Sequence, residues 1–124
     1  MDRRQFLGTV AAGLLISRSG NDFAAQAVVT DGQPQTLRLW PAEPPGGGGP
    51  AGPVQWTAKG AQSNITQPLL SVYSPTKPNG YAVLIAAGGG YKRIEMASEA
   101  LPAARWLAAR GFTAYVLSYR LPAE

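Results

Sequence analysis

The stretch Tyr81-Ala82-Val83-Leu84-Ile85-Ala86-Ala87-Gly88-Gly89-Gly90-Tyr91 decides the fold of this chain. Its first six residues are nearly all apolar, which is typical of a strand buried on both faces of a sheet. After the glycines, residues 98–110 carry an apolar stripe at helical spacing, and residues 112–119 are rich in β-branched and aromatic side chains. The order strand, glycine loop, helix, strand predicts one βαβ unit with a right-handed crossover, and therefore an α/β fold.

The ends of these elements carry residues with known local preferences. Pro102 is tolerated best in the first turn, so the regular helix is expected to begin near it. Gly111 is suited to end the helix, because glycine adopts the left-handed conformation common at helix C-termini. Upstream, residues 69–74 predict a strand, and residues 77–80 supply a Pro-Asn-Gly turn. We expect that strand to pair with residues 81–86 as a hairpin-like antiparallel unit.

Residues 28–67 form a looser segment than residues 68–124. Within it, residues 36–40 alternate between apolar and polar side chains and predict a short edge strand. The Pro- and Gly-rich run 44–53 has the composition of a flexible surface loop. It spells G-x-G-x-x-G, but no strand leads directly into it and its prolines break any following helix. A phosphate-binding loop is therefore not predicted there.

The first residues, 1–27, have the features of an export signal. Arg3-Arg4-Gln5-Phe6-Leu7 is a twin-arginine pair followed by Phe-Leu, and a modest apolar stretch runs from Val10 to Ile16. Ala25-Gln26-Ala27 then offers an A-x-A cleavage site. The alternative is a basic N-terminus on a short amphipathic helix. The signal reading predicts the twin-arginine export machinery as a partner and a periplasmic or extracellular location in a bacterium. The apolar stretch is too short for a stable membrane span, although a retained signal would leave a short anchor.

Composition limits the possible functions of the chain. Its 124 residues allow one domain at most, and 45% hydrophobic against 15% charged residues is typical of a globular protein. Cysteine and histidine are absent, so the chain alone cannot assemble a thiolate metal site, a His-ligated metal or a Ser-His-Asp triad. The net charge is +4, but only Lys92-Arg93 are adjacent in the segment after the signal. Nucleic-acid binding, which needs a clustered basic surface, is not predicted.

The glycine run carries the chemistry that the sequence offers. Three glycines directly after a buried strand let the backbone approach a ligand closely. Their N–H groups are expected at the carboxyl end of the sheet, where ligands of open α/β sheets bind, and such donors stabilise a developing oxyanion in acyl transfer. The alternative is a tight strand-to-helix turn without a ligand. The pattern of residues alone leaves both open.

Residues 70–122 resemble the α/β-hydrolase superfamily, specifically its secreted esterases with a GGGY-type oxyanion loop, which include acetylxylan and other carbohydrate esterases. The resemblance covers some 50 residues in the family's order and spacing. The matching pieces are Val72-Tyr73-Ser74-Pro75, Asn79-Gly80-Tyr81-Ala82-Val83-Leu84-Ile85, Gly88-Gly89-Gly90-Tyr91, Ala104-Arg105-Trp106-Leu107, Arg110-Gly111-Phe112 and Val116-Leu117-Ser118-Tyr119-Arg120-Leu121-Pro122.

The resemblance implies roles for the glycine run. Gly89 and Gly90 are the expected oxyanion-hole donors, Gly88 permits the turn beside the substrate, and Tyr91 lines the acyl or sugar pocket. For Tyr91 a place in the core is the alternative. The implied substrate is a small-molecule or carbohydrate ester, and neither a cofactor nor a metal is implied.

The family's nucleophile elbow, G-x-S-x-G, and the acid and histidine after it have no counterpart among these residues. We therefore expect residues 68–124 to be the N-terminal portion of an α/β-hydrolase domain with an incomplete sheet and an exposed apolar strand edge. The expected function is the oxyanion half of an exported serine esterase, inactive on its own. Two alternatives are a non-catalytic exported carbohydrate-binding module and an interaction protein that pairs its open strand edge with a partner.

Overall fold

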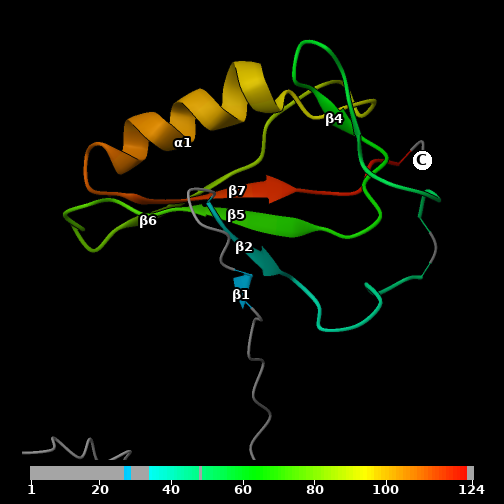
Figure 1. Cartoon of the computed structure of the whole chain (residues 1–124), viewed down its shortest axis with the longest axis horizontal. Helices are drawn as coiled ribbons and strands as arrows, with labels where there is room; N and C mark the ends of the chain where they lie inside the picture. The colour runs from blue at the N-terminus through cyan, green and yellow to red at the C-terminus, as the bar shows by residue number, and fades with distance from the viewer. Residues whose placement is uncertain (1–26, 29–33, 48, 123–124) are drawn as a thin grey trace, which may run out of the picture.

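The computed structural model describes residues 27–28, 34–47 and 49–122, which form a mixed sheet with one helix across one face (Figure 1). The sheet has five strands in the order β1-β2-β5-β7-β6. A separate two-stranded hairpin lies beyond the N-terminal end of the helix. The strands of the main sheet are β1 (Ala27–Val28), β2 (Gln35–Arg38), β5 (Leu69–Tyr73), β6 (Ala82–Ile85) and β7 (Thr113–Ser118), and those of the hairpin are β3 (Gln55–Trp56) and β4 (Gln62–Ser63).

The predicted βαβ unit is present, because β6 and β7 pair in parallel and the helix lies between them in the sequence. The predicted hairpin of β5 with β6 is wrong, since β7 lies between those strands and pairs antiparallel with β5. The physical reason is burial. In β7, every second residue, namely Ala114, Val116 and Ser118, is buried, so this strand takes the centre of the sheet.

The regular helix begins near Pro102, as expected, although residues 98–100 of the predicted range are π-helical. A π-helical turn, Met96–Ala100, leads into the α-helix α1 (Leu101–Ala108), and Pro102 lies in the first turn of α1 as predicted. The prediction for Gly111 is also confirmed, since its φ is +90°. Its N–H donates to the Ala108 carbonyl at 3.1 Å, and the Phe112 N–H donates to the Leu107 carbonyl at 3.2 Å. These two bonds are the Schellman pattern that satisfies the last carbonyls of a helix.

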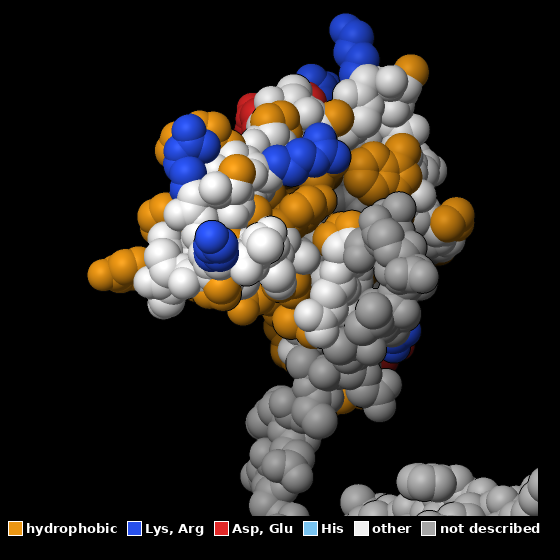
Figure 2. Space-filling model, turned by 60° about the vertical axis from the view of Figure 1, so that its left-hand side comes forward, with side chains coloured by type: hydrophobic (Ala, Val, Ile, Leu, Met, Phe, Trp, Pro, Cys, Tyr) orange, Lys and Arg blue, Asp and Glu red, His pale blue; other side chains and the backbone are white. Residues whose placement is uncertain are grey.

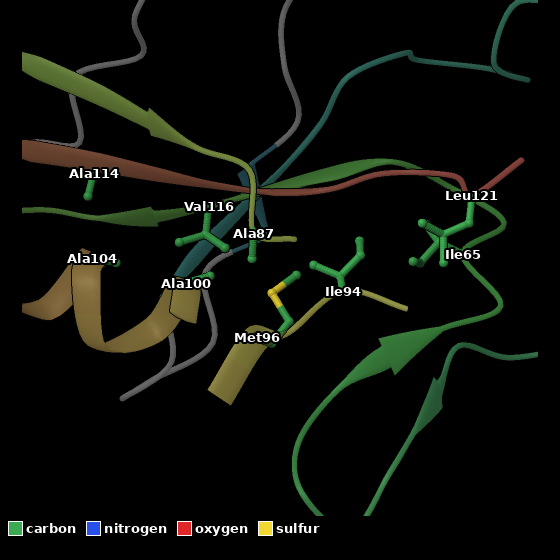
Figure 3. Packing of buried hydrophobic residues seen from close by; sticks show 9 residues of the cluster. All are labelled: Ile65, Ala87, Ile94, Met96, Ala100, Ala104, Ala114, Val116 and Leu121. Atoms are coloured by element: carbon green, nitrogen blue, oxygen red, sulfur yellow. The ribbon is translucent and has the colours of Figure 1, made fainter. Parts of the chain in front are cut away.

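The core lies between α1 and the face of the sheet that α1 covers (Figure 3). Small side chains let the helix approach the central strand closely, because Ala100 and Ala104 of the helical segment and Ala114 of β7 are all fully buried. At the other end of the core, Ile65 and Ile94 are fully buried and extend the cluster toward the β3–β4 hairpin. Residue 94 also forms an antiparallel bridge to Gln62, which fastens the hairpin to the segment that follows the glycines.

The opposite face of the sheet is apolar as well. The pairing registers place Leu37 opposite Leu70, and Leu70 opposite Leu117, on this face. Leu84 of β6 lies on the same face and is 62% exposed. In the described part of the chain no helix covers these residues, and the expectation that β6 is buried on both faces is therefore wrong.

The predicted export signal covers residues 1–27, and its last residue, Ala27, is the first residue of β1. The register partner of Ala27 in β2 is Leu37. The twin-arginine motif and the apolar stretch of the predicted export signal lie outside the described residues. In the part of the chain that the structure describes, no helix has the length and apolar composition needed to cross a membrane.

Candidate functional site

The glycine loop, residues 88–91, follows β6 at its carboxyl end. The N–H of Gly88 donates to Oε2 of Glu99 at 2.9 Å, and the carbonyl of Gly88 accepts from the Glu95 N–H at 2.9 Å. Just before the loop, the Tyr119 hydroxyl donates to the Ala87 carbonyl at 2.6 Å. Tyr119, which follows β7, and Glu95 and Glu99, near the start of the helical segment, therefore fix residues 87 and 88 at the start of the loop.

The middle of the loop turns sharply and leaves its donors free. The φ angles of Gly89, Gly90 and Tyr91 are +145°, +65° and +61°, values that glycine adopts readily and tyrosine rarely. In the described part of the chain, the N–H groups of these three residues have no hydrogen-bond acceptor. The loop therefore presents consecutive backbone donors at the carboxyl end of a parallel strand, an arrangement suited to an anionic oxygen.

The four predicted site residues are thus contiguous but differ in their roles within the loop. Gly88 is exposed, yet its N–H is already used by Glu99, whereas Gly89 and Gly90 keep theirs available. The side chain of Tyr91 is 74% exposed, so the alternative that placed it in the core is wrong. Its exposed position leaves the ring free to contact a ligand.

A second loop, the proline–glycine loop (described residues 44–47 and 49–53), accepts hydrogen bonds from two distant side chains. Arg120, just after β7, donates from Nη1 to the Gly47 carbonyl at 3.0 Å and from Nη2 to the Pro45 carbonyl at 2.9 Å. Asn64 Nδ2 donates to the carbonyls of Ala51 and Pro53 at 3.1 and 2.7 Å. The prediction of a surface loop is confirmed for the described residues of this run, which form turns and bends and are mostly exposed, and its flexibility stays a prediction.

Sequence reasoning missed the side chains that hold these loops, namely Asn64, Glu95, Glu99, Tyr119 and Arg120. For Tyr119 and Arg120 a signal existed, because both belong to the stretch that resembles the esterases. For Asn64 the available signal was its residue type, since asparagine tolerates left-handed backbone and its φ is +56°.

Glu95 follows the glycine loop and interacts with two neighbouring side chains. Nε of Arg93 donates to its Oε1, and the Ser98 hydroxyl donates to its Oε2 at 3.2 Å. The hydrogen bond from Arg93 holds the pKa of the Glu95 carboxyl below its usual range, with Ser98 and the charge of Lys59 acting in the same direction. A lowered folded-state pKa means that this carboxylate stabilises the fold above its unfolded pKa, about 4.3, and that the contribution is lost as the pH falls through the folded value.

We expect Arg93→Gln to raise the pKa of Glu95 toward its ordinary value, because the largest cause of the shift is removed. The carboxyl carbon shift of Glu95, followed by NMR through an acid titration, measures this directly. Lys59→Gln is the matched control and is expected to move the pKa less, since Lys59 acts only through its charge. An equal effect of the two variants would contradict the assignment.

The described residues hold no cluster of three or more His, Cys, Asp or Glu that could bind a metal ion. Ser118, a buried serine, is not a candidate nucleophile in this arrangement, because its hydroxyl donates to Oε1 of the buried Gln62 at 2.6 Å. Among the described residues, the unpaired N–H groups of the glycine loop are suited to bind an anionic oxygen.

A large cleft of about 970 Å³ lies away from the glycine loop, between the edge of α1 and the strands β2 and β5. Leu69, Val72 and Leu101 contribute apolar surface to it, and Arg105 and Trp56 also line it. Figure 2 shows hydrophobic side chains gathered on one face of the molecule with Lys and Arg side chains around them. The cleft contains none of the glycine-loop residues, so its size is no evidence for catalysis.

No protein-family profile and no solved structure matches the chain. Among curated proteins, the chain is similar to an acetylxylan esterase from Xylanibacter ruminicola, with 36% identity over 50 residues. This stretch is 40% of the present chain and 10% of that enzyme, so the match spans about a tenth of the relative's length. The similarity suggests an esterase-like function for the chain and is too short to establish a family.

Proposed function

We propose that this chain supplies the oxyanion-binding half of an exported serine esterase of the α/β-hydrolase superfamily, acting on acetyl esters of carbohydrates. Gly89 and Gly90 donate their N–H groups to the oxyanion of the tetrahedral intermediate. Gly88 fixes the turn, and Tyr91 lines the pocket for the acyl or sugar group. The nucleophile, the acid and the histidine come from residues beyond this sequence, and the complete enzyme is periplasmic or extracellular.

The free, consecutive donors of the glycine loop carry the proposal. The N–H groups of Gly89 and Gly90 have no acceptor in the described part of the chain. The N–H of Gly88 donates to the Glu99 carboxylate, and this bond anchors the start of the loop. Donors fixed before the reaction stabilise developing negative charge without reorganising, which is the largest contribution to catalysis in many enzymes. The similarity to an acetylxylan esterase supports the same chemistry and the carbohydrate ester as substrate.

Sequencing the DNA downstream of the Glu124 codon tests this proposal most directly. We expect a reading frame, continuous or restored by one frameshift, that encodes G-x-S-x-G and later an Asp and a His. The protein from the complete frame should release acetate from acetylated xylan, and its nucleophile Ser→Ala variant should not. In that protein, Gly89→Ala, whose Cβ would overlap the Arg93 carbonyl and so move the loop donors, is expected to lower kcat by about 10²–10³, the usual effect of losing one oxyanion donor.

A stop codon with no such coding sequence downstream would overturn the esterase proposal. The second proposed function would then be the non-catalytic carbohydrate-binding module, for which the exposed Tyr91 beside free backbone donors is the supporting observation. Binding of xylo-oligosaccharides by the chain, measured by calorimetry, would support it.

A further inference from the structure

The peptide unit that joins Ala87 to Gly88 is held at both of its polar ends. Its carbonyl, which belongs to Ala87, accepts a hydrogen bond from the Tyr119 hydroxyl at 2.6 Å. Its N–H, which belongs to Gly88, donates to Oε2 of Glu99 at 2.9 Å. Because a peptide unit is planar, bonds at its two ends fix its orientation at the start of the glycine loop.

The next two peptide units are held through their carbonyls. The Gly88 carbonyl accepts the Glu95 N–H at 2.9 Å. The Gly89 carbonyl accepts the Lys92 N–H at the longer distance of 3.4 Å. In a trans peptide the N–H points opposite to the carbonyl, and the described residues contain no cis peptide. The N–H groups of Gly89 and Gly90 therefore point away from the segment that follows the loop.

The last peptide unit of the loop, between Gly90 and Tyr91, differs from these two. The Gly90 carbonyl accepts no hydrogen bond from the described residues. The direction of the Tyr91 N–H is therefore not set by a bond at the other end of its peptide unit.

We propose that Glu99 is a positioning residue of the oxyanion site. Its carboxylate withdraws the Gly88 N–H from the site and leaves Gly89 and Gly90 as the pair of oriented donors that meets the oxyanion. This inference rests on the proposed esterase function and deepens it, because it assigns the side chain that decides which donors of the loop face the ligand.

A carboxylate is suited to this role because it accepts hydrogen bonds and donates none, and a bond to a charged acceptor is stronger than one to a neutral acceptor. The neighbouring acid cannot replace it. The two carboxylate oxygens of Glu95 accept from Arg93 and from Ser98, whereas the bond of the Glu99 side chain within the described chain is the one from Gly88.

NMR spectroscopy of the 124-residue chain tests the hydrogen bond without a ligand. Glu99→Gln and Glu99→Ala both remove the negative charge, but only Glu99→Gln keeps an acceptor. We therefore expect hydrogen exchange of the Gly88 amide to be about five-fold faster in Glu99→Ala than in Glu99→Gln. Ser98→Ala is the matched control from the same helical turn, and it should leave this rate unchanged because the Ser98 hydroxyl bonds to Glu95.

Titration of the same proteins with methylphosphonate, a tetrahedral anion, tests the choice of donors. In the parent chain we expect the anion to shift the amide signals of Gly89 and Gly90 and to leave that of Gly88 in place. In Glu99→Ala the Gly88 signal should shift as well, because its N–H is released, and Glu99→Gln should restore the parent pattern. A merely structural role of Glu99 would lower the melting temperature without changing which amides respond.

The outcomes separate this inference from the function on which it rests. Equal exchange rates of the Gly88 amide in Glu99→Ala and Glu99→Gln, or a methylphosphonate shift of Gly88 in the parent chain, would overturn the role of Glu99. Absence of a methylphosphonate shift at Gly89 and Gly90, with the difference in exchange retained, would instead overturn the oxyanion role of the loop while establishing the bond from Gly88 to Glu99.

Discussion

Replacing Gly89 with alanine is expected to lower the free energy of unfolding by about 3 kcal/mol, as measured by urea denaturation. A Cβ at this position would lie 2.0 Å from the carbonyl oxygen of Arg93 and 2.7 Å from its carbonyl carbon. Both atoms are backbone, so no side-chain rotation relieves the overlap. The φ of +145° is in addition a conformation that residues with a Cβ rarely adopt. The loop must therefore rearrange or the fold must open, and a small domain has little stability to lose.

Gly90→Ala is the matched control for this variant. Gly90 also has a positive φ, +65°, but a Cβ there would meet nothing within 4 Å. Only the conformational cost of the left-handed region remains, about 1 kcal/mol. Equal destabilisation by the two variants would show that the contact with Arg93 does not constrain the loop. In the complete esterase that we propose, Gly89→Ala should also displace the donors and reduce the rate of ester hydrolysis.

The ends of the helix and the turn before β6 could be predicted from the sequence, because single residues within them determine the backbone conformation. Pro102 and Gly111 mark the ends of α1 because proline fixes φ and glycine accepts a positive φ wherever they occur. The turn before β6 was predictable for the same reason. The Asn79 side chain accepts the Tyr81 N–H at 2.9 Å, and Gly80 has a φ of +85°. In these cases the cause lies within a few residues of its effect.

Strand pairing was not predictable in this way. β5 and β6 are neighbours in the sequence and a turn joins them, so a hairpin was the natural expectation. The strand that separates them, β7, comes after the helix and takes the central place because its buried side chains contact α1. The order of strands thus depends on packing between segments that no local window contains.

In the candidate site, too, features that depend on adjacent residues were predicted, and features that depend on distant residues were not. The glycine loop was found from three consecutive residues, and its position after a parallel strand followed from the βαβ unit. The anchors of the proline–glycine loop span 73 and 75 residues of sequence for Arg120, so composition alone suggested a free loop. The side chains of Arg120 and Asn64 donate to four carbonyls in the described part of this run, and these long-range hydrogen bonds leave no mark on its composition.

The apolar outer face of the sheet leads to the second large expected effect, which concerns association. Leu84 is 62% exposed on β6, beside the row formed by Leu37, Leu70 and Leu117. β6 is an edge strand, because it pairs with β7 on one side and with no strand of the described chain on the other. An exposed apolar face beside such an edge favours self-association.

We expect the chain to form oligomers at micromolar concentration and Leu84→Lys to shift its mass in solution toward the 13.0 kDa monomer, because a charge at this position opposes both face-to-face contact and edge pairing. Light scattering after size-exclusion chromatography measures the mass, and binding of a hydrophobic dye should fall in the same variant.

Trp106→Lys is the matched control, since Trp106 is 55% exposed but lies on α1, across the sheet from this face. A similar decrease in both variants would mean that apolar surface in general, rather than this face of the sheet, drives the association. A monomeric parent chain would contradict the prediction outright.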